Sequence, residues 1–266
     1  MQRLLLTGAA GGLGQMLRRE LAGYAPTLRL SDIANLGVAG PGEEIVPCDL
    51  ADADAVMKLV EGCDYIVHLG GKSIEGTFEE ILQSNIRGAY NIFEAARQHG
   101  KPRILFASSN HAIGFHTRET RLDGNSLQRP DSLYGVSKCF GEALGCYYYD
   151  KFGLENVCVR IGSCFPEPKD RRMLATWLSG ADFIRLIKRV AEATRIGHTI
   201  VYGASNNQEQ WWDNSHAAFL GWVPQDSSEQ FRAKIEAAHP RQAPEDTVVR
   251  YQGGGFAAAG HFEEKS

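Results

Sequence analysis

The residues best suited to chemistry in this chain of 266 are a tyrosine and a lysine four positions apart, in YGVSK at 134–138. On a helix, positions i and i+4 share a face, so the Lys138 ammonium would lie beside the Tyr134 hydroxyl. A neighbouring positive charge favours the phenolate and lowers a tyrosine pKa from its usual value of about 10. Tyr134 is therefore a candidate general base. The alternative is an exposed helix pair without a role in catalysis, since YxxxK is common by chance.

A serine upstream of this pair extends the candidate catalytic group. Ser109 follows the apolar run at 104–107, which has the composition of a strand. A hydroxyl at the end of a strand can hydrogen-bond the substrate oxygen from which Tyr134 takes a proton.

A glycine-rich turn near the N-terminus is suited to a dinucleotide. The stretch TGAAGGLG at 7–14 lies between a predicted strand at 4–7 and a predicted helix at 13–22. Glycines let the backbone approach a pyrophosphate, and the free N–H groups of a helix N-terminus attract its charge. The candidate cofactor-binding residues of this turn are Gly8, Gly11, Gly12, Leu13 and Gly14.

The end of the second predicted strand, at 28–31, indicates which cofactor binds. Asp32 follows it, with Ile33 beside it, and a carboxylate here can accept both ribose hydroxyls of an adenosine. It would repel a 2′-phosphate and no arginine follows, so NAD is favoured over NADP; the alternative for Asp32 is a loop cap. Further candidates follow the third and fourth strands: Asp49 and Leu50 near the adenine, and Leu69, Gly70 and Gly71 where the backbone passes close to the cofactor.

The elements that must position these groups are short apolar strands alternating with helical patterns. Further strands are expected at 44–46, 65–69, 157–161 and 199–202, and helices at 53–61 (N-cap Asp52), 78–98, 134–152 and 183–195. Apolar strands between helices predict an α/β fold, a Rossmann-like doubly wound parallel sheet. We expect an NAD-binding domain at 1–205 and a small C-terminal annex and tail at 206–266, with a last helix at 228–238. The tail is either a loose terminus or, through Phe256, part of the substrate pocket.

Composition argues against several classes of protein. With 28 Lys and Arg against 32 Asp and Glu, the net charge of −4 lacks the basic footprint of a nucleic-acid binder. The apolar runs fall far short of the ~20 residues of a membrane span, and no signal peptide is evident. The six cysteines form no CxxC pair, so neither a metal site nor a disulfide framework is expected. Unpaired thiols fit a reducing cytoplasm.

Together these motifs resemble the extended short-chain dehydrogenase/reductase superfamily. The resemblance covers roughly residues 1–205 and is carried by TGAAGGLG, Asp32, CDLAD at 48–52, HLGG at 68–71, Asn85 in NIRGAYN, ASSN at 107–110 and YGVSK. More narrowly, the chain is similar to the uronate dehydrogenase family over nearly its whole length. The finer match rests on ASSNHAIG at 107–114, RPDSLYGVSKCFGE at 129–142, RIGSCFPEP at 160–168, RRMLATW at 171–177, WWDNSHAAFLGW at 211–222 and RYQGGGF at 250–256.

The narrower resemblance implies NAD-dependent oxidation of a hexuronate, D-glucuronate or D-galacturonate, at C1. The anomeric hydroxyl would give its proton to Tyr134 while hydride leaves toward the nicotinamide. The product would be an aldaro-lactone that opens to an aldarate (glucarate or galactarate). Lys138 would also hold the nicotinamide ribose, and Asn85 would support a proton relay, unless it only bonds a backbone carbonyl in its helix. A homo-oligomer is implied as well, because the helix at 134–152 is a common dimer face in the superfamily.

The resemblance also implies a substrate-binding set. Arg172 would grip the substrate carboxylate bidentately, although without the match Arg171 is an equal candidate; with it, Arg171 is expected to be solvated. Phe256 would pack over the sugar, or else only cover an apolar patch. Ile161 and Cys164 would lie beside the nicotinamide, and a nucleophilic Cys164 is disfavoured because it has no evident partner. The candidates for bonding sugar hydroxyls are Ser73, Asn110, His111 and Ser163.

Two other functions compete with this one. A sugar-nucleotide epimerase or dehydratase would retain its NAD and release no net NADH, but the short chain leaves little room for a nucleotide-sugar pocket. A non-enzymatic NAD-sensing module predicts a missing base or lysine, and both are present. Glucuronate and galacturonate differ by one hydroxyl, so both stay candidate substrates.

Overall fold

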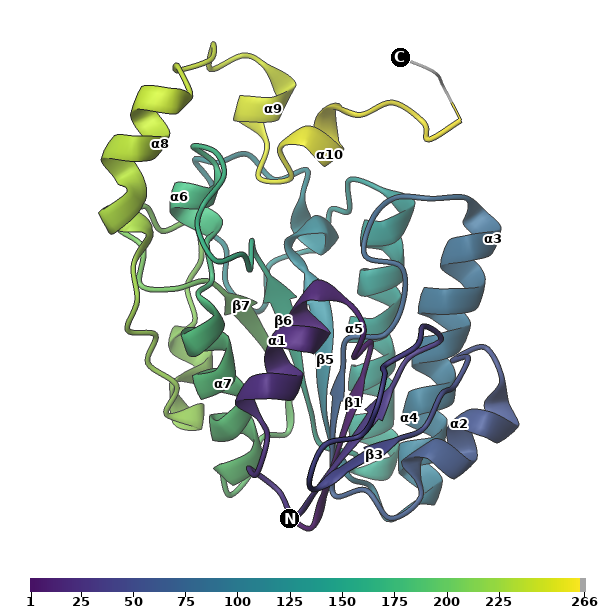
Figure 1. The fold of residues 1–266 in the computed structure, drawn as a ribbon. Helices are drawn as coiled ribbons and strands as arrows, with labels where there is room; N and C mark the ends of the chain where they lie inside the picture. The colour runs from purple at the N-terminus through teal and green to yellow at the C-terminus, as the bar shows by residue number, and fades with distance from the viewer. Residues whose placement is uncertain (264–266) are drawn as a thin grey trace.

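Within residues 1–263, which this computed structural model describes, seven strands form one parallel sheet (Figure 1). The strands are β1 (Arg3–Thr7), β2 (Thr27–Ser31), β3 (Glu43–Ile45), β4 (Tyr65–His68), β5 (Arg103–Ser109), β6 (Asn156–Ile161) and β7 (His198–Gly203). Their spatial order is β3-β2-β1-β4-β5-β6-β7, so the chain winds first to one side of β1 and then to the other. The predicted Rossmann-like fold is therefore confirmed, and its usual ligand crevice lies at the strand ends where β1 meets β4.

Helices cover both faces of the sheet. The longer ones are α1 (Gly12–Glu20), α2 (Ala53–Val60), α4 (Gly88–Gln98), α5 (Leu133–Phe152), α7 (Gly180–Glu192) and α8 (Arg232–Ala238). Short ones are α3 (Phe78–Ile81), η1 (Leu82–Arg87), η2 (Asn110–Ile113), α6 (Met173–Thr176), η3 (Ser215–Leu220), η4 (Ser228–Phe231), α9 (Thr247–Arg250) and α10 (Gly255–Ala258).

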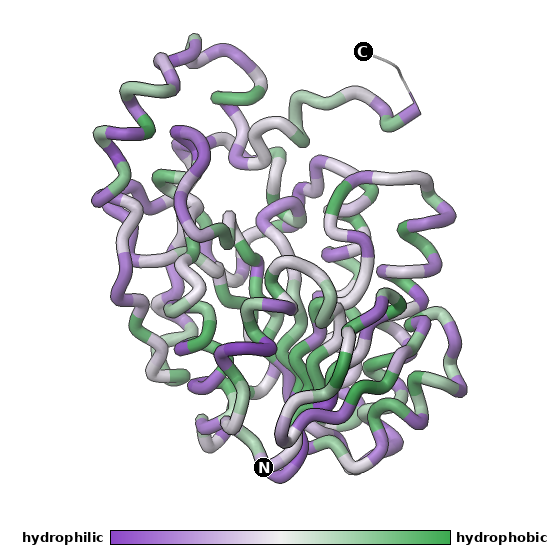
Figure 2. The backbone as a smooth tube through the Cα atoms, viewed as in Figure 1, coloured by the Kyte–Doolittle hydropathy of each residue, from purple (hydrophilic) through white to green (hydrophobic). Residues whose placement is uncertain are grey.

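The core consists of two apolar layers, one on each face of the sheet. Along β1, Leu4 and Leu6 join the layer that contains Phe183 of α7, whereas Leu5 joins the layer that contains Phe93 of α4. This alternation follows from the two-residue period of a strand. Figure 2 shows the apolar strands gathered inside the shell of more polar helices. Because both faces are covered, the site is confined to the ends of the strands.

A buried ion pair fastens α5 to the sheet. The Arg160 guanidinium on β6 donates to both carboxylate oxygens of Glu142 on α5, at 2.9 and 2.8 Å. Glu142 also accepts a hydrogen bond from the hydroxyl of Ser108, at 2.6 Å. The helix that carries Tyr134 is thereby tied to the strand that ends in Ser109.

Most predicted elements are present, with two instructive differences. Asp52 caps α2 as expected, since its side chain accepts from the backbone N–H groups of Asp54 and Ala55. The helix predicted at 78–98 is not uniform, because its Leu82–Arg87 segment is a π-helix. The helix predicted at 183–195 begins earlier, at Gly180, where the Ser179 hydroxyl caps it, and ends at Glu192.

The C-terminal segment crosses the carboxyl ends of the strands. Figure 1 shows α9 and α10, in yellow, above the ends of β5 and β6. Residues 264–266 of the predicted annex and tail lie outside the described residues. None of the helices in the described part of the chain is long and apolar enough to cross a membrane.

Candidate active site

Three of the predicted catalytic side chains meet where α5 begins. Tyr134 and Lys138 lie in the first turns of α5, which the Ser132 hydroxyl caps by accepting from the N–H of Gly135 at 2.9 Å. The Lys138 ammonium lies 5.4 Å from the centre of the Tyr134 ring. A side-chain hydrogen bond joins Tyr134 to Ser109 at the end of β5. All three residues are buried.

The predicted lowering of the Tyr134 pKa by Lys138 is wrong for the ligand-free protein. Burial raises the pKa of Tyr134 to about 12, and the hydrogen bond with Ser109 opposes that rise only in part. Burial also lowers the pKa of Lys138 to about 8. Desolvation disfavours the charged form of each group and is the largest cause of both pKa shifts. A further positive charge in the site would help Tyr134 to lose its proton.

The glycine-rich turn fits NAD. Gly8 has φ +71°, and a Cβ there would lie 2.9 Å from the backbone nitrogen of Gly70, so this position requires glycine. A Cβ on Gly12 would meet nothing within 4 Å, so packing leaves that face of the turn open for a ligand. The first N–H bonded within α1 is that of Gln15, which donates to Gly11, and no side chain caps the helix. The preceding N–H groups, including those of Leu13 and Gly14, are thus available to a pyrophosphate.

The other predicted cofactor residues surround this turn. The Asp32 carboxylate accepts from the N–H groups of Ala10 and Ala34, at 2.9 and 3.0 Å, so it both holds the turn and caps its own loop. Its remaining lone pairs can accept ribose hydroxyls. Across the crevice, the Gly70 N–H donates to the Thr7 hydroxyl at 3.1 Å, with Leu69 half-buried beside it. Ile33, Asp49 and Gly71 are exposed, and Leu50 is half-buried.

Asn85 lies in the π-helix rather than in a regular turn. Its amide accepts from the N–H of Lys72 at 2.7 Å and donates to the Lys72 carbonyl and the Ser137 hydroxyl, both at 2.9 Å. Within residues 1–263, no hydrogen bond joins the Asn85 side chain to Tyr134 or Lys138. Asn85 therefore clamps the loop after β4 against α5.

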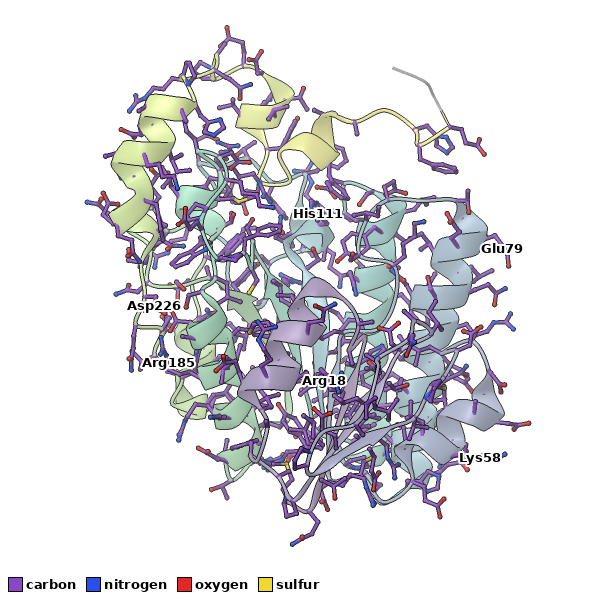
Figure 3. All side chains as sticks on the ribbon, in the orientation of Figure 1. Arg18, Lys58, Glu79, His111, Arg185 and Asp226 are labelled. Carbon is purple, nitrogen blue, oxygen red and sulfur yellow. The ribbon has the colours of Figure 1, made fainter. Side chains whose placement is uncertain are left out.

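An aromatic group forms the opposite wall of the site. The imidazole of His111 stacks on the Phe256 ring, with centroids 3.9 Å apart, and meets the edge of Tyr134 at 5.9 Å. The Asp131 carboxylate bonds Nδ1 of His111 at 2.9 Å. Figure 3 shows the labelled His111 beneath α10, at the carboxyl ends of the strands. Residues from both the sheet and the C-terminal tail therefore face the tyrosine.

Arg172 supplies a cationic group to the same space. Its Nε donates to the Gln252 carbonyl at 2.6 Å and its Nη1 approaches the Ser163 hydroxyl at 3.5 Å. With its amide oriented to satisfy both ends, Asn110 donates to the carbonyls of Ile161 and Gly162 and accepts from Nη2 of Arg172. Burial lowers the pKa of Arg172 to about 10. Across residues 1–263 no carboxylate forms an ion pair with it, so its charge is available to an anionic ligand.

Several predicted residues lie apart from this group or play another part. Arg171 is not simply solvated, because it is half-buried and bonds the carboxylate of Glu236 on α8 at 3.2 Å. Ser73 is exposed on the loop after β4. Cys164 lies near the end of β6, where burial raises its pKa to about 12, which disfavours a thiolate nucleophile.

Three residues of the site were missed from the sequence. Asp131 orients His111, Gln252 bonds Arg172, and Glu75 accepts from the backbone N–H of Tyr134 at 3.2 Å. Asp131 stands in the RPDSLYGVSK match, which was a usable signal. Gln252 stands in the RYQGGGF match, which was also a usable signal, whereas Glu75 stands in a polar, glycine-containing stretch that no motif or periodic pattern marks. The described residues contain no group of His, Cys, Asp and Glu that could hold a metal ion.

Comparison with known proteins places this arrangement among sugar-acid dehydrogenases. Residues 4–216 match the model of the NAD dependent epimerase/dehydratase family. A uronate dehydrogenase from Pseudomonas putida is 58% identical over 261 residues, which are 98% of this chain and 97% of that protein. The crystal structure of a glucuronic acid dehydrogenase from Chromohalobacter salexigens superposes with a TM-score of 0.97 at 60% identity, covering 98% of each chain. A uronate dehydrogenase variant from Agrobacterium tumefaciens, complexed with NAD, gives 0.97 at 56% identity over 99% of this chain and 100% of that one.

Proposed function

Because the chain belongs to the NAD dependent epimerase/dehydratase family, we propose that it is a uronate dehydrogenase, which oxidises D-glucuronate or D-galacturonate at C1 with NAD⁺. The single observation that carries the substrate class is Arg172, a half-buried guanidinium without a carboxylate partner in the described chain. Asn110, which accepts a hydrogen bond from Arg172, directly follows Ser109 in the chain. Ser109 in turn bonds Tyr134. We infer that a single sugar acid reaches both groups at once.

Tyr134 takes up the proton of the anomeric hydroxyl in this proposal, and Ser109 holds the same oxygen by a hydrogen bond. The C1 hydrogen leaves with its electron pair, so the ring carbon is oxidised to the aldaro-lactone, which then opens to the aldarate. When bound, NAD⁺ supplies the hydride acceptor. Lys138 adds a positive charge that stabilises the phenolate against the burial that otherwise favours the neutral phenol.

Arg172 orients the substrate. Its guanidinium can donate two parallel N–H hydrogen bonds to a carboxylate, a geometry that a lysine does not provide. Phe256 and His111 present aromatic faces to the sugar ring, and Asn110 and Ser163 offer polar atoms to its hydroxyls. Ser73 is proposed to bond a hydroxyl from the loop after β4.

The proposal is tested by mixing purified protein with NAD⁺ and either uronate and following NADH absorbance. Stoichiometric NADH is expected, whereas an epimerase or dehydratase would release none. Tyr134→Phe should lower turnover about 10²- to 10⁴-fold, since a general base contributes that much. NAD binding, measured by fluorescence titration, should persist in the variant. Full turnover by Tyr134→Phe would contradict the role of the tyrosine.

We further propose that the protein works in the cytoplasm as a homo-oligomer. All six cysteines are free, which supports a reducing compartment. Tyr90 on α4 and Val136 and Tyr147 on α5 each expose 45–48% of their surface, which supports burial of these helices against a second copy. Light scattering at micromolar concentration tests the oligomer, and a monomer there would contradict it.

A further inference from the structure

The Arg172 side chain is held by the C-terminal tail. Its Nε donates to the backbone carbonyl of Gln252 at 2.6 Å, which occupies one edge of the guanidinium. Its two terminal nitrogens point instead to Ser163 and Asn110. Because a guanidinium is planar, fixing Nε determines where the two-nitrogen fork points.

Hydrogen bonds hold both the side chain and the backbone of Gln252 in place. Its side chain is fully buried, and its amide nitrogen donates to the carbonyls of Thr117 and Thr120 at 3.1 and 2.9 Å. Its amide oxygen accepts from the indole N–H of Trp212 at 2.8 Å. Its backbone N–H donates to the His116 carbonyl at 2.9 Å. A carbonyl fixed in this way can hold Nε of Arg172 in one place.

Gly254, two residues later, leaves the space that the arginine side chain needs. Its φ of +62° suits glycine, and a Cβ there would lie 2.6 Å from Cδ of Arg172 and 3.0 Å from its Nε. The next glycine, Gly255, differs in this respect, because a Cβ on it would meet nothing within 4 Å. Of these two neighbours, only Gly254 leaves space that the Arg172 side chain occupies.

We propose that Gln252 and Gly254 are positioning residues for substrate specificity. They orient the two terminal nitrogens of Arg172 toward the carboxylate of an acid sugar. An enzyme in which this orientation is lost binds uronates poorly. This inference rests on the proposed function. It assigns the preference for acid sugars partly to the tail, which does not itself supply the cation.

A double-mutant cycle distinguishes this role from simple closure of the pocket by the tail. Gly254→Ala should lower kcat/KM for glucuronate about tenfold or more in the otherwise unchanged enzyme, mainly through KM. In the Arg172→Ala background the same change should have a clearly smaller effect, because the arginine atoms that the new Cβ meets are gone and only the backbone strain at φ +62° remains. Gly255→Ala is the matched control and should stay within about twofold in both backgrounds.

An equal loss in both backgrounds would overturn the inference, since the tail would then act without Arg172. If Gly254→Ala does not fold, as judged by thermal unfolding and NAD titration, Gln252→Leu in the same cycle decides the matter. It removes the three side-chain bonds that hold the carbonyl, and the same dependence on Arg172 is expected. An unmutated enzyme that does not reduce NAD⁺ with any uronate would instead refute the proposed function before the cycle begins.

Discussion

Replacing Lys138 with methionine is expected to stabilise the ligand-free protein at neutral pH while removing its activity. Burial lowers the pKa of Lys138 from 10.5 to about 8, so keeping the ammonium charged costs folding free energy. One pKa unit corresponds to about 1.4 kcal/mol, so the free energy of unfolding should rise by about 3 kcal/mol in Lys138→Met at pH 7. Turnover should fall because the phenol of Tyr134 loses its neighbouring positive charge.

The sign of the effect gives it a characteristic pH dependence. The folded pKa of Lys138 lies below the unfolded one, so the penalty is fully present below about pH 8. Above the unfolded value of 10.5 the lysine is neutral in both states and the penalty vanishes. The stability difference between Lys138→Met and the unmodified protein should therefore shrink steadily across this window.

Urea unfolding of both proteins without cofactor, at several pH values between 7 and 10.5, measures this difference. Lys58→Met is a suitable control, because Lys58 is exposed on α2 (Figure 3) and its loss should change stability by no more than about 0.5 kcal/mol. The reasoning would be refuted if Lys138→Met were less stable than the unmodified protein at pH 7, or if the stability difference between the two did not change with pH. It would mean that burial does not penalise this ammonium.

Three further predictions concern other parts of the molecule. Arg172→Ala should lower kcat/KM for glucuronate about 100-fold or more, since bonds to charged groups contribute about 1.5–3 kcal/mol each; Arg171→Ala should change it less than about threefold, and an unchanged Arg172→Ala would assign the carboxylate elsewhere. Asp32→Ala should weaken NAD binding about tenfold and raise the affinity for NADP relative to that for NAD, as measured by fluorescence titration, because the charge that repels a 2′-phosphate is gone. An unaltered ratio of the two affinities would count against that role. Glu142→Ala should lower the free energy of unfolding by about 3–5 kcal/mol in urea, because it leaves Arg160 buried and unpaired; a loss under about 1 kcal/mol would be inconsistent with this.

The strand-end residues were predictable because a parallel sheet brings the carboxyl ends of its strands to one edge. Ser109 at the end of β5, Asp32 after β2 and Ser163 beyond β6 were all placed by apolar runs that mark the strands. The i, i+4 spacing likewise placed Tyr134 and Lys138 in one region of α5. These inferences need only local patterns and the topology.

The features that escaped prediction depend on contacts across the chain. The pKa of Tyr134 is set by its depth of burial, which no spacing reveals. Gln252 is hydrogen-bonded to Thr117, Thr120 and Trp212, which are distant in sequence, so the RYQGGGF match marks its stretch but does not reveal its burial. The π-helix at Leu82–Arg87 keeps the apolar spacing of an ordinary helix, so the widened turn leaves no signal in the residue pattern.

The crossing of the tail over the strand ends has a consequence for biosynthesis. All seven strands of the sheet precede residue 204, whereas the segment that holds Arg172 begins at Gln252. On the ribosome, the part of the chain that forms the sheet and the NAD-binding turn can therefore fold while the last fifty or so residues are still in or near the exit tunnel. We expect a nascent chain to acquire affinity for NAD before it can tell an acid sugar from a neutral one.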